Sequence, residues 1–377
     1  MRVAALIWIG WCGLLSACGS KGGTGPGTTL NGDAMVASQS DADNLKSYSE
    51  ITGDLVIAAA GVTDLAFPNL ARVGGSIVLD NNVSDSIQTL AFPALTTVGK
   101  TLNLGVTDQT ASNSESITLQ SADLTSLQTI GDSLEYNGQA LAQANFPKLT
   151  TVGGRATVSV TNGVSFPVLQ QVAAGIFTIA NATAQATLSP SDQTLDLPSL
   201  QIVGFDFSIT GDFAQINVPA LQSVGGSLLL DQIADLTTFS APALTSLSAV
   251  ATQQMEAQMD TAGALDVSND PALTTFSAPQ LAGMIWTLHV ASDDALTSFN
   301  ANAVSALYRI DVTDNPVLST VSVNALSTLL PSSSSLSLVR FLNNPALSTC
   351  FCQNLATKLN DSLGAVIQGD LNDTPCM

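Results

Sequence analysis

One short pattern recurs along most of this 377-residue chain and constrains its fold more than any other feature. The clearest copies are FPNLARVGGSIVL (67–79), FPALTTVGKTLNL (92–104), FPKLTTVGGRATVSV (146–160), LPSLQIVGFDFSI (197–209) and VPALQSVGGSLLL (218–230). Weaker copies are LTSLQTIGDSLEY (124–136), FPVLQQVAAGIFTI (166–179), APALTSLSAV (241–250) and APQLAGMIWTLHV (278–290). Such self-similarity is typical of solenoids, because each repeat buries its apolar face only against its neighbours.

Each copy of the pattern reads as one turn of a β-solenoid. The proline holds φ at about −65° at a corner and donates no hydrogen bond, and the Leu and Val that follow are expected to point inward. The Gly-Gly pair is expected to allow the turn into the next strand. Closing segments such as SIVL and SLLL then alternate inward and outward with period two. The sequence therefore predicts a mainly β protein built as a parallel β-solenoid.

Towards the C-terminus the pattern approaches that of leucine-rich repeats. The copies are ALDVSNDPALTTF (264–276), TLHVASDDALTSF (287–299), RIDVTDNPVLSTV (309–321) and RFLNNPALSTC (340–350). Their expected inward leucines are Leu273, Leu296, Leu318 and Leu347. The short polar residues predicted to form a column at the corner, where they would bond unpaired backbone groups, are Asn269, Ser292, Asp314 and Asn343. A calcium site is the alternative, weakened by the lack of the glycine-rich pattern of calcium-binding β-helices.

The segment DADNLKSYSEITGDLVI (41–57), followed by repeats of the form FPxLxxVGGxLxL, resembles the receptor L-domain family. That family comprises the right-handed, leucine-rich-like β-helical modules of insulin-receptor and EGF-receptor relatives. The chain is similar also to fungal cell-wall glycoproteins of the L-domain type and to lipoproteins of soil bacteria. The resemblance covers roughly residues 41 to 350 and implies a right-handed parallel β-solenoid of leucine-rich-repeat type. No ligand-contacting position of the family maps onto this chain, and the receptor disulfides are absent from the repeats.

The N-terminus predicts export and lipid attachment. Arg2 precedes VAALIWIGWCGLL (3–15), which has the length of a signal-peptide core and is too short to span a bilayer. The segment Leu15 to Cys18, at the end of this apolar run, resembles the lipobox of bacterial lipoproteins. In those proteins the peptide is cleaved before the cysteine, and the cysteine thiol carries diacylglycerol. The prediction is a signal peptide over 1–17 and lipidation at Cys18. An ordinary secretory signal with a chance cysteine is the alternative.

Residues 18–44 are expected to form a flexible tether, because Gly, Ser, Thr and Asp dominate and no apolar period is visible. Gly19 directly after Cys18 resembles lipoproteins that are sorted to the outer membrane, so that membrane is favoured within the cell envelope. Surface-exposed and periplasmic placement both stay open.

Charge excludes one class of partner. Removal of residues 1–17 takes away Arg2 and no acidic residue, so the formal charge goes from −20 to −21. A surface so acidic repels nucleic acid. Hydrophobic residues make up 45% of the chain, which is enough to build a core for the solenoid predicted over residues 45–349.

Residues 350–377 are expected to close the C-terminal end of the solenoid. Leu45 to Tyr48, together with Ile51, are expected to close its N-terminal end. A short helix is predicted over 353–361, with Leu355 and Leu359 on one face, followed by a last strand AVIQG. In an exported chain the three cysteines here predict a disulfide. Cys350 and Cys352 are too close to pair with each other, so Cys376 is expected to pair with one of them, with Cys350 favoured. A metal site is the alternative.

His289 is the only histidine of the chain. If Leu288 and Val290 face the core, His289 faces outward, and neighbouring coils place three more charged residues in its column. The predicted exposed charge ladder is Asp266, His289, Asp311 and Arg340, which is expected to be stabilised by cross-strand pairs of opposite sign. A divalent cation site is the alternative, although a flat open row gives poor coordination geometry.

The sequence contains no nucleophile elbow, Walker motif, HExxH or paired CxxC, so we expect no enzyme, no cofactor and no bound metal. The expected function is a lipid-anchored cell-envelope protein whose solenoid is a surface for binding a protein or glycan, or for organising the envelope. One alternative is a polysaccharide-active β-helix enzyme, with the insert AVATQQMEAQMDTAG (249–263) walling a cleft. The other is a purely structural spacer.

Overall fold

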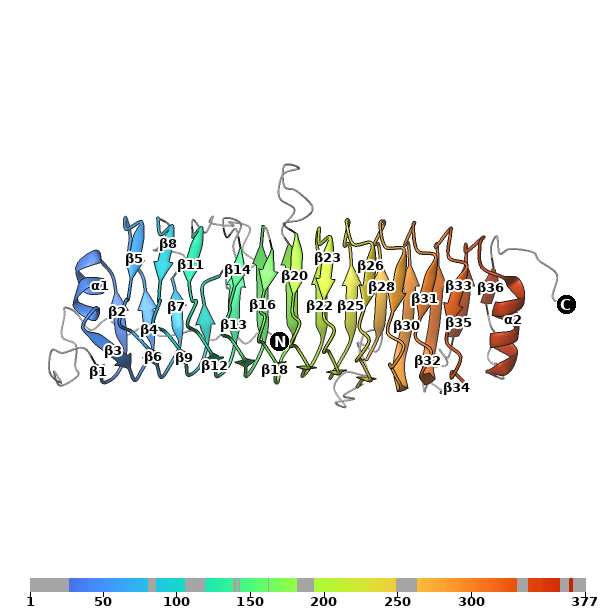
Figure 1. Cartoon of the computed structure of the whole chain (residues 1–377), viewed down its shortest axis with the longest axis horizontal. Helices are drawn as coiled ribbons and strands as arrows, with labels where there is room; N and C mark the ends of the chain where they lie inside the picture. The colour runs from blue at the N-terminus through green and yellow to red at the C-terminus, as the bar shows by residue number, and fades with distance from the viewer. Residues whose placement is uncertain are drawn as a thin grey trace, which may run out of the picture.

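A computed structural model describes residues 27–80, 86–105, 119–137, 141, 143–161, 163–181, 193–248, 263–330, 338–359 and 366–368. Through these ranges the chain winds into an elongated β-solenoid whose coils follow one another along the long axis (Figure 1). Every described strand pairing is parallel and joins successive coils, as the sequence predicts. Cys18 and residues 1–26 as a whole lie outside the described residues.

Each full coil contributes a strand to three faces. Sheet A has 10 strands: β1 (Thr28–Leu30), β3 (Tyr48–Ile51), β6 (Arg72–Val73), β9 (Thr97–Val98), β12 (Thr129–Ile130), β15 (Thr151–Val152), β18 (Gln171–Val172), β21 (Ile202–Val203), β24 (Ser223–Val224) and β27 (Ser246–Leu247).

Sheet B, the second face, has 15 strands. They are β2 (Ala34–Val36), β4 (Leu55–Ile57), β7 (Ile77–Leu79), β10 (Leu102–Asn103), β13 (Leu134–Asn137), β16 (Ala156–Val160), β19 (Phe177–Asn181), β22 (Phe207–Thr210), β25 (Leu228–Asp231), β28 (Leu265–Ser268), β30 (Gly283–Ala291), β32 (Val304–Thr313), β34 (Thr328–Leu329), β35 (Leu338–Leu342) and β36 (Val366–Gln368).

The third face is divided into three short sheets. Sheet C contains β5 (Asp64–Ala66), β8 (Thr89–Ala91) and β11 (Ser121–Asp123). Sheet D contains β14 (Ala144–Asn145), β17 (Val164–Ser165), β20 (Thr194–Asp196) and β23 (Gln215–Asn217). Sheet E contains β26 (Thr238–Ser240), β29 (Thr275–Ser277), β31 (Ser298–Asn300) and β33 (Thr320–Ser322).

The core consists of the inward side chains of these strands, stacked coil on coil. The expected inward leucines Leu273, Leu296, Leu318 and Leu347 are all buried. Phenylalanines at equal positions form stacked pairs; the rings of Phe276 and Phe299, for example, have centroids 4.7 Å apart. Aromatic stacking of this kind adds to the burial of apolar area, which is the main source of stability in a repeat fold.

The glycine of the repeat is needed for close approach and not for a turn. Gly99, Gly131 and Gly153 occupy the same corner in successive coils, and none has a positive φ. A Cβ on each would clash with the carbonyl oxygen of the preceding glycine in the column, beginning with Gly74 beneath Gly99. The expectation that these glycines allow the turn is therefore wrong, and the backbones of adjacent coils meet here without side chains between them.

The N-terminal tether is shorter than predicted. From Thr28 the chain already forms β1 and β2, which pair with β3 and β4, and Leu30 and Val36 join the core. Helix α1 (Gln39–Leu45) follows, with its N-terminus capped by the Ser38 side chain. The apolar residues of 27–44 are few, but Leu30, Ala34 and Val36 lie in strands that pair with the next coil, so the segment can fold despite its polar composition. Helix α1 lies at one end of the solenoid (Figure 1).

The other end is closed by helix α2 (Thr349–Lys358), which begins four positions earlier than predicted. Leu355 and Leu359 are buried, as expected from their shared face. Cys350 lies in the helix and not at a strand end, and Cys352 is a free, buried thiol whose pKa burial raises to about 12. Cys376 lies outside the described residues, so its pairing with Cys350 stays a prediction. Within the described ranges neither helix has the length and apolarity to cross a bilayer.

The polar corner column is displaced by one residue from its predicted place. Asn269, Ser292, Asp314 and Asn343 have φ between 55° and 59° and are exposed. This left-handed backbone turns the next side chain inward, so the residues that form the column are Asp270, Asp293, Asn315 and Asn344, each 0% exposed. We call these four the corner ladder. The side-chain oxygen of each accepts from the backbone N–H of the coil before it, at 2.8 to 3.1 Å.

Asparagine and aspartate are not equivalent in the corner ladder. Asn315 Nδ2 also donates to the carbonyls of Val290 and Thr313, at 3.0 and 2.9 Å. The matching oxygens, Oδ2 of Asp270 and of Asp293, are buried and make no hydrogen bond. Burial raises the pKa of Asp270 to about 7 and that of Asp293 to about 8, with Asp231, Asp266 and Asp294 adding repulsion. The two carboxyls therefore favour the protonated form, in which they can donate as asparagine does.

We predict that Asp293→Asn stabilises the fold at alkaline pH. A carboxyl whose folded pKa is raised contributes stability that is present below its unfolded value of about 3.9 and is lost as pH rises through the folded pKa, here about 8. At pH 9 the variant should gain roughly 1 to 3 kcal/mol, the cost of a buried unsatisfied group. At pH 5 it should differ little from the wild type.

Urea unfolding at both pH values measures this difference. Asp235→Asn, at an exposed position that is not among the charges acting on Asp293, is the matched control and should not change the pH dependence. An Asp293→Asn variant that is less stable than the wild type at pH 9 would contradict the assignment.

Candidate functional site

Sheets A and B meet without a corner in the coils that contain β30 and β32. These coils carry GMIWTLHV and VSALYRIDV in place of the Val-Gly-Gly pattern, and their strands run for 9 and 10 residues. Ile285 and Leu288 both point inward, as do Leu307 and Ile310. The residues between and beside them are therefore displayed on one continuous outer surface.

The structure places the four residues of the charge ladder at equal register positions. Asp266 pairs with His289, His289 with Asp311, and Asp311 with Arg340 on successive strands. His289 Nδ1 lies 3.0 Å from Asp266 Oδ1. Arg340 donates from Nε and Nη2 to the two carboxylate oxygens of Asp311, at 2.7 and 2.5 Å. The ladder thus consists of two side-by-side pairs, Asp266 with His289 and Asp311 with Arg340.

The description of the ladder as exposed is wrong for Asp311, whose side chain is only 1% exposed. Arg309, which sequence reasoning missed, donates to Asp311 Oδ2 at 2.8 Å, so guanidinium groups from two residues cover this carboxylate. Alternation with period two already puts residues 309 and 311 on the same face, and that signal could have found Arg309. Alternation with period two assigns a side chain to one face of a strand, but it does not show which long side chains on neighbouring positions will cover it.

An aromatic pair lies beside the ladder. Trp286 and Tyr308 stack across neighbouring strands with ring centroids 3.9 Å apart and an interplanar angle of 30°. Both rings are half-buried, and Met284 on the same face is 47% exposed. The largest fully buried side chains include eleven phenylalanines, so this pair differs from the aromatic residues of the core. We call Met284, Trp286, Tyr308, Arg309 and Arg340 the aromatic–arginine patch.

Electrostatics favour the protonated forms of His289 and Arg340. The hydrogen bond to Asp266 raises the pKa of His289 above its usual value, against the opposing effects of burial and of Arg309. The hydrogen bond to Asp311 likewise raises the pKa of Arg340. Among the described residues no cluster of three or more His, Cys, Asp or Glu side chains is arranged to hold a metal ion.

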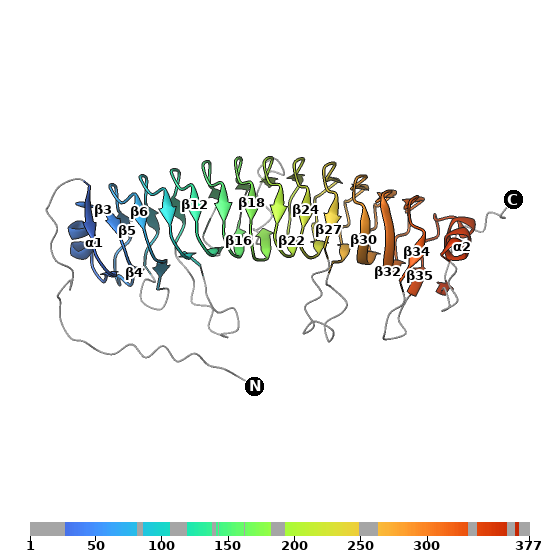
Figure 2. The same ribbon diagram turned by 90° about the horizontal axis from the view of Figure 1, so that it is seen from below.

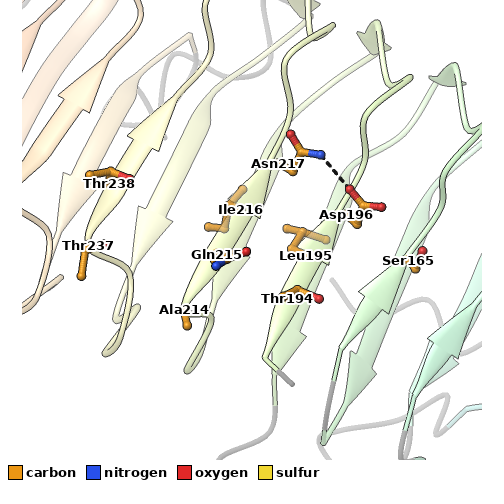
Figure 3. Close-up of a pocket in the computed structure, with 10 residues that line it drawn as sticks. All are labelled: Ser165, Thr194, Leu195, Asp196, Ala214, Gln215, Ile216, Asn217, Thr237 and Thr238. Carbon is orange, nitrogen blue, oxygen red and sulfur yellow. Dashed lines mark hydrogen bonds between the residues drawn. The ribbon is translucent and has the colours of Figure 1, made fainter. Parts of the chain in front are cut away.

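A second feature is a polar groove over β20, β23 and β26, with a cavity volume of about 630 Å³ (Figure 3). The lining residues are Ser165, Thr194, Leu195, Asp196, Ala214, Gln215, Ile216, Asn217, Thr237 and Thr238. Asn217 Nδ2 donates to Asp196 Oδ1 at 2.8 Å. Sequence reasoning did not find this groove. The expected cleft wall, residues 249–263, lies outside the described residues apart from Gly263.

The groove forms where the solenoid changes its corner. From inward Ile209 of β22 to Ile216 of β23 the chain takes seven steps, whereas from Leu230 of β25 to Phe239 of β26 it takes nine. β23 and β26 are neighbours that do not pair, so sheet D ends where sheet E begins. Ile216 packs against the core but is only partly buried, although Leu195 and Phe239 are buried.

Comparison with known proteins gives a distant relationship and no family. No family model matches the chain. A cell surface GPI-anchored protein of Arthroderma benhamiae is 28% identical over 248 residues, which is 53% of this chain and 63% of the relative. The match therefore spans less than two thirds of the relative's length.

We predict that Asp266→Asn lowers the pKa of His289. The raised pKa means that the His289–Asp266 pair contributes stability below about pH 6.5, and that this contribution is lost as pH climbs through the folded value. Removal of the Asp266 charge takes away the largest contribution that favours the imidazolium and leaves Asp311 alone to oppose burial and Arg309, both of which disfavour it. Proton NMR on this one histidine follows the titration directly. Asp294→Asn is the control and should leave it unchanged, and a higher pKa in Asp266→Asn than in the wild type would refute the pairing.

Proposed function

We propose that this chain is a lipid-anchored cell-envelope protein that presents its β-solenoid as a recognition surface and catalyses no reaction. The observation that carries the proposal is the aromatic–arginine patch. Protein interfaces are enriched in Trp, Tyr, Met and Arg, and their energetic centres especially so. Elsewhere the outward columns consist mostly of Ser, Thr, Asn and Asp, as in sheet E.

The patch is organised before any partner binds. Buried Asp311 fixes guanidinium groups of Arg309 and Arg340 on one side, and the stacked rings of Trp286 and Tyr308 fix the other. Side chains already held in place lose less entropy on binding than free ones. Arg309 and Arg340 thereby present two guanidinium groups at this surface, on a chain of net charge −20. The partner that fits is a protein surface with acidic and apolar groups.

Two separate observations support the proposed location of the protein. The Leu15 to Cys18 motif favours a diacylglycerol anchor on Cys18, and Gly19 favours the outer membrane. The printed name of the fungal relative describes a cell surface protein with a GPI anchor, which supports a surface location but a different attachment. We infer that two acyl chains, each adding about 0.8 kcal/mol per buried CH₂, hold the solenoid at the membrane.

The absence of catalysis is part of the proposal. The ladder lies on an open sheet, where His289 and Asp311 are engaged by Asp266 and by arginines. The lining of the groove includes one carboxylate, Asp196, whereas glycoside hydrolysis ordinarily requires two.

Two variants test this function together. Cys18→Ala should release the chain from the membrane fraction and abolish labelling with a radioactive fatty acid. The released chain, labelled with a fluorophore, should then bind to intact cells that lack their own copy. Adding Trp286→Ala and Tyr308→Ala should weaken that binding about 10-fold or more, because truncation of central aromatic residues removes at least about 2 kcal/mol.

The matched control is Ser208→Ala, an outward position of sheet B remote from the patch. Equal binding by the control and by the double aromatic variant would contradict a recognition role for the patch. Retention of Cys18→Ala in membranes with continued labelling would contradict the anchor.

A further inference from the structure

We propose that the groove over β20, β23 and β26 binds a segment of a neutral polysaccharide. The site is on the third face of the solenoid, apart from the aromatic–arginine patch on sheets A and B, and so goes beyond the recognition role proposed above. Most of its side chains come from the paired strands β17, β20 and β23 of sheet D, and Thr238 comes from β26 of sheet E (Figure 3). Rigid elements hold a binding constellation better than loops do.

The lining offers the hydrogen-bonding groups that sugar hydroxyls need. A sugar hydroxyl both donates and accepts, and it is matched by a carboxylate that accepts and by amides that do both. Asp196 is the carboxylate, and its hydrogen bond with Asn217 aligns the carboxylate and the amide at 2.8 Å. Gln215 and Asn217 are exposed to the groove, and Thr194 and Thr238 add hydroxyls. A hydroxyl that donates to ionised Asp196 forms a charge-assisted bond, the strongest on offer here.

Apolar contact is supplied by Ile216. Ile216 is the inward residue between outward Gln215 and Asn217; its side chain packs against the core but is only partly buried, and it contributes to the lining of the groove at the break between sheets D and E. The C–H face of a pyranose ring can cover this side chain and remove its apolar area from water, which is favourable in proportion to the area buried. A mostly polar site with a small apolar element suits a sugar better than a hydrocarbon.

The same lining disfavours the other ligand classes. It contains no Lys, Arg or His, and the chain carries a net charge of −20, so an anionic polymer would be repelled. It contains no aromatic side chain and no Met, so it lacks the residues on which protein interfaces depend. A neutral, hydroxyl-rich ligand is the class that remains compatible with both facts.

Two rows of short polar side chains lead away from the groove along the solenoid axis. One row is Thr238, Thr275, Ser298 and Thr320, and the other is Ser240, Ser277, Asn300 and Ser322. Successive members are about 4.8 Å apart, the spacing of neighbouring strands. The rows continue the groove as a straight polar track, so the ligand is expected to be a chain running along the axis and not a single sugar.

Binding by the purified full chain tests the proposal. The probes are soluble mannan, laminarin and hydroxyethyl cellulose as neutral polymers and polygalacturonate as the acidic one, measured by affinity gel electrophoresis and calorimetry. We expect at least one neutral polymer to retard the chain, its short oligomers to bind more weakly than the polymer, and polygalacturonate not to bind. Asn217→Ala and Asp196→Asn should each weaken binding about 10-fold, and circular dichroism should show that both remain folded.

Ser208→Ala is the matched control, because it removes a hydroxyl at an outward position of sheet B, outside both the groove and the two polar rows. It should bind within about 2-fold of the wild type. Failure of all three neutral polymers to bind, equal binding by Asn217→Ala, or preference for polygalacturonate would each overturn the proposal. Release of reducing ends from a bound polymer would overturn it as well, because the site would then be catalytic. The aromatic variant Trp286→Ala should bind these polymers normally, so this result is independent of the patch.

Discussion

Backbone hydrogen bonding between successive coils is the interaction on which the rest of the structure depends. The strands of a coil pair with the coils before and after it, so backbone groups are satisfied only if equal positions stack in register. Because of that requirement, residues at equal positions of successive repeats lie above one another and form columns along the solenoid. Glycines, phenylalanines, corner amides and surface charges each form a column for the same reason, and each column either permits or reinforces the stacking.

The two candidate sites lie where the repeat departs from this regularity. Loss of the Gly-Gly corner joins sheets A and B in β30 and β32 and exposes the surface that carries Trp286 and Tyr308. The break between sheets D and E, where β23 and β26 do not pair, lies at the groove beside Ile216. Variation in corners on a fixed core is how repeat proteins gain distinct surfaces.

The sequence predicted the fold and much of the register because both follow from periodicity. Copies of one pattern place Asp266, His289, Asp311 and Arg340 at equal positions, and the structure has them there. Periodicity could not show that Asn269 adopts a left-handed φ, which moves the corner ladder to Asp270 and its counterparts. It could not show the burial of Asp311 either, since that depends on which long side chains lie above it. The N-terminal coil was missed because its few apolar residues are meaningful only beside the coil they pair with. The groove was missed because it lies where sheet D ends and sheet E begins, and the repeat pattern does not show which strands of the third face pair.

Disulfide trapping between outward positions tests the stacking register most directly. Ser240 and Ser277 are paired on neighbouring strands of sheet E, whereas Ser322 lies at the same position three coils from Ser240. Strands about 4.8 Å apart place Cα atoms within the range that a disulfide can bridge, and positions three coils apart fall far outside it. Under mild oxidation, peptide mapping by mass spectrometry should find the new bond in the Ser240→Cys/Ser277→Cys variant and not in Ser240→Cys/Ser322→Cys. A bond that forms in the second variant and not in the first would contradict the register on which the whole account rests.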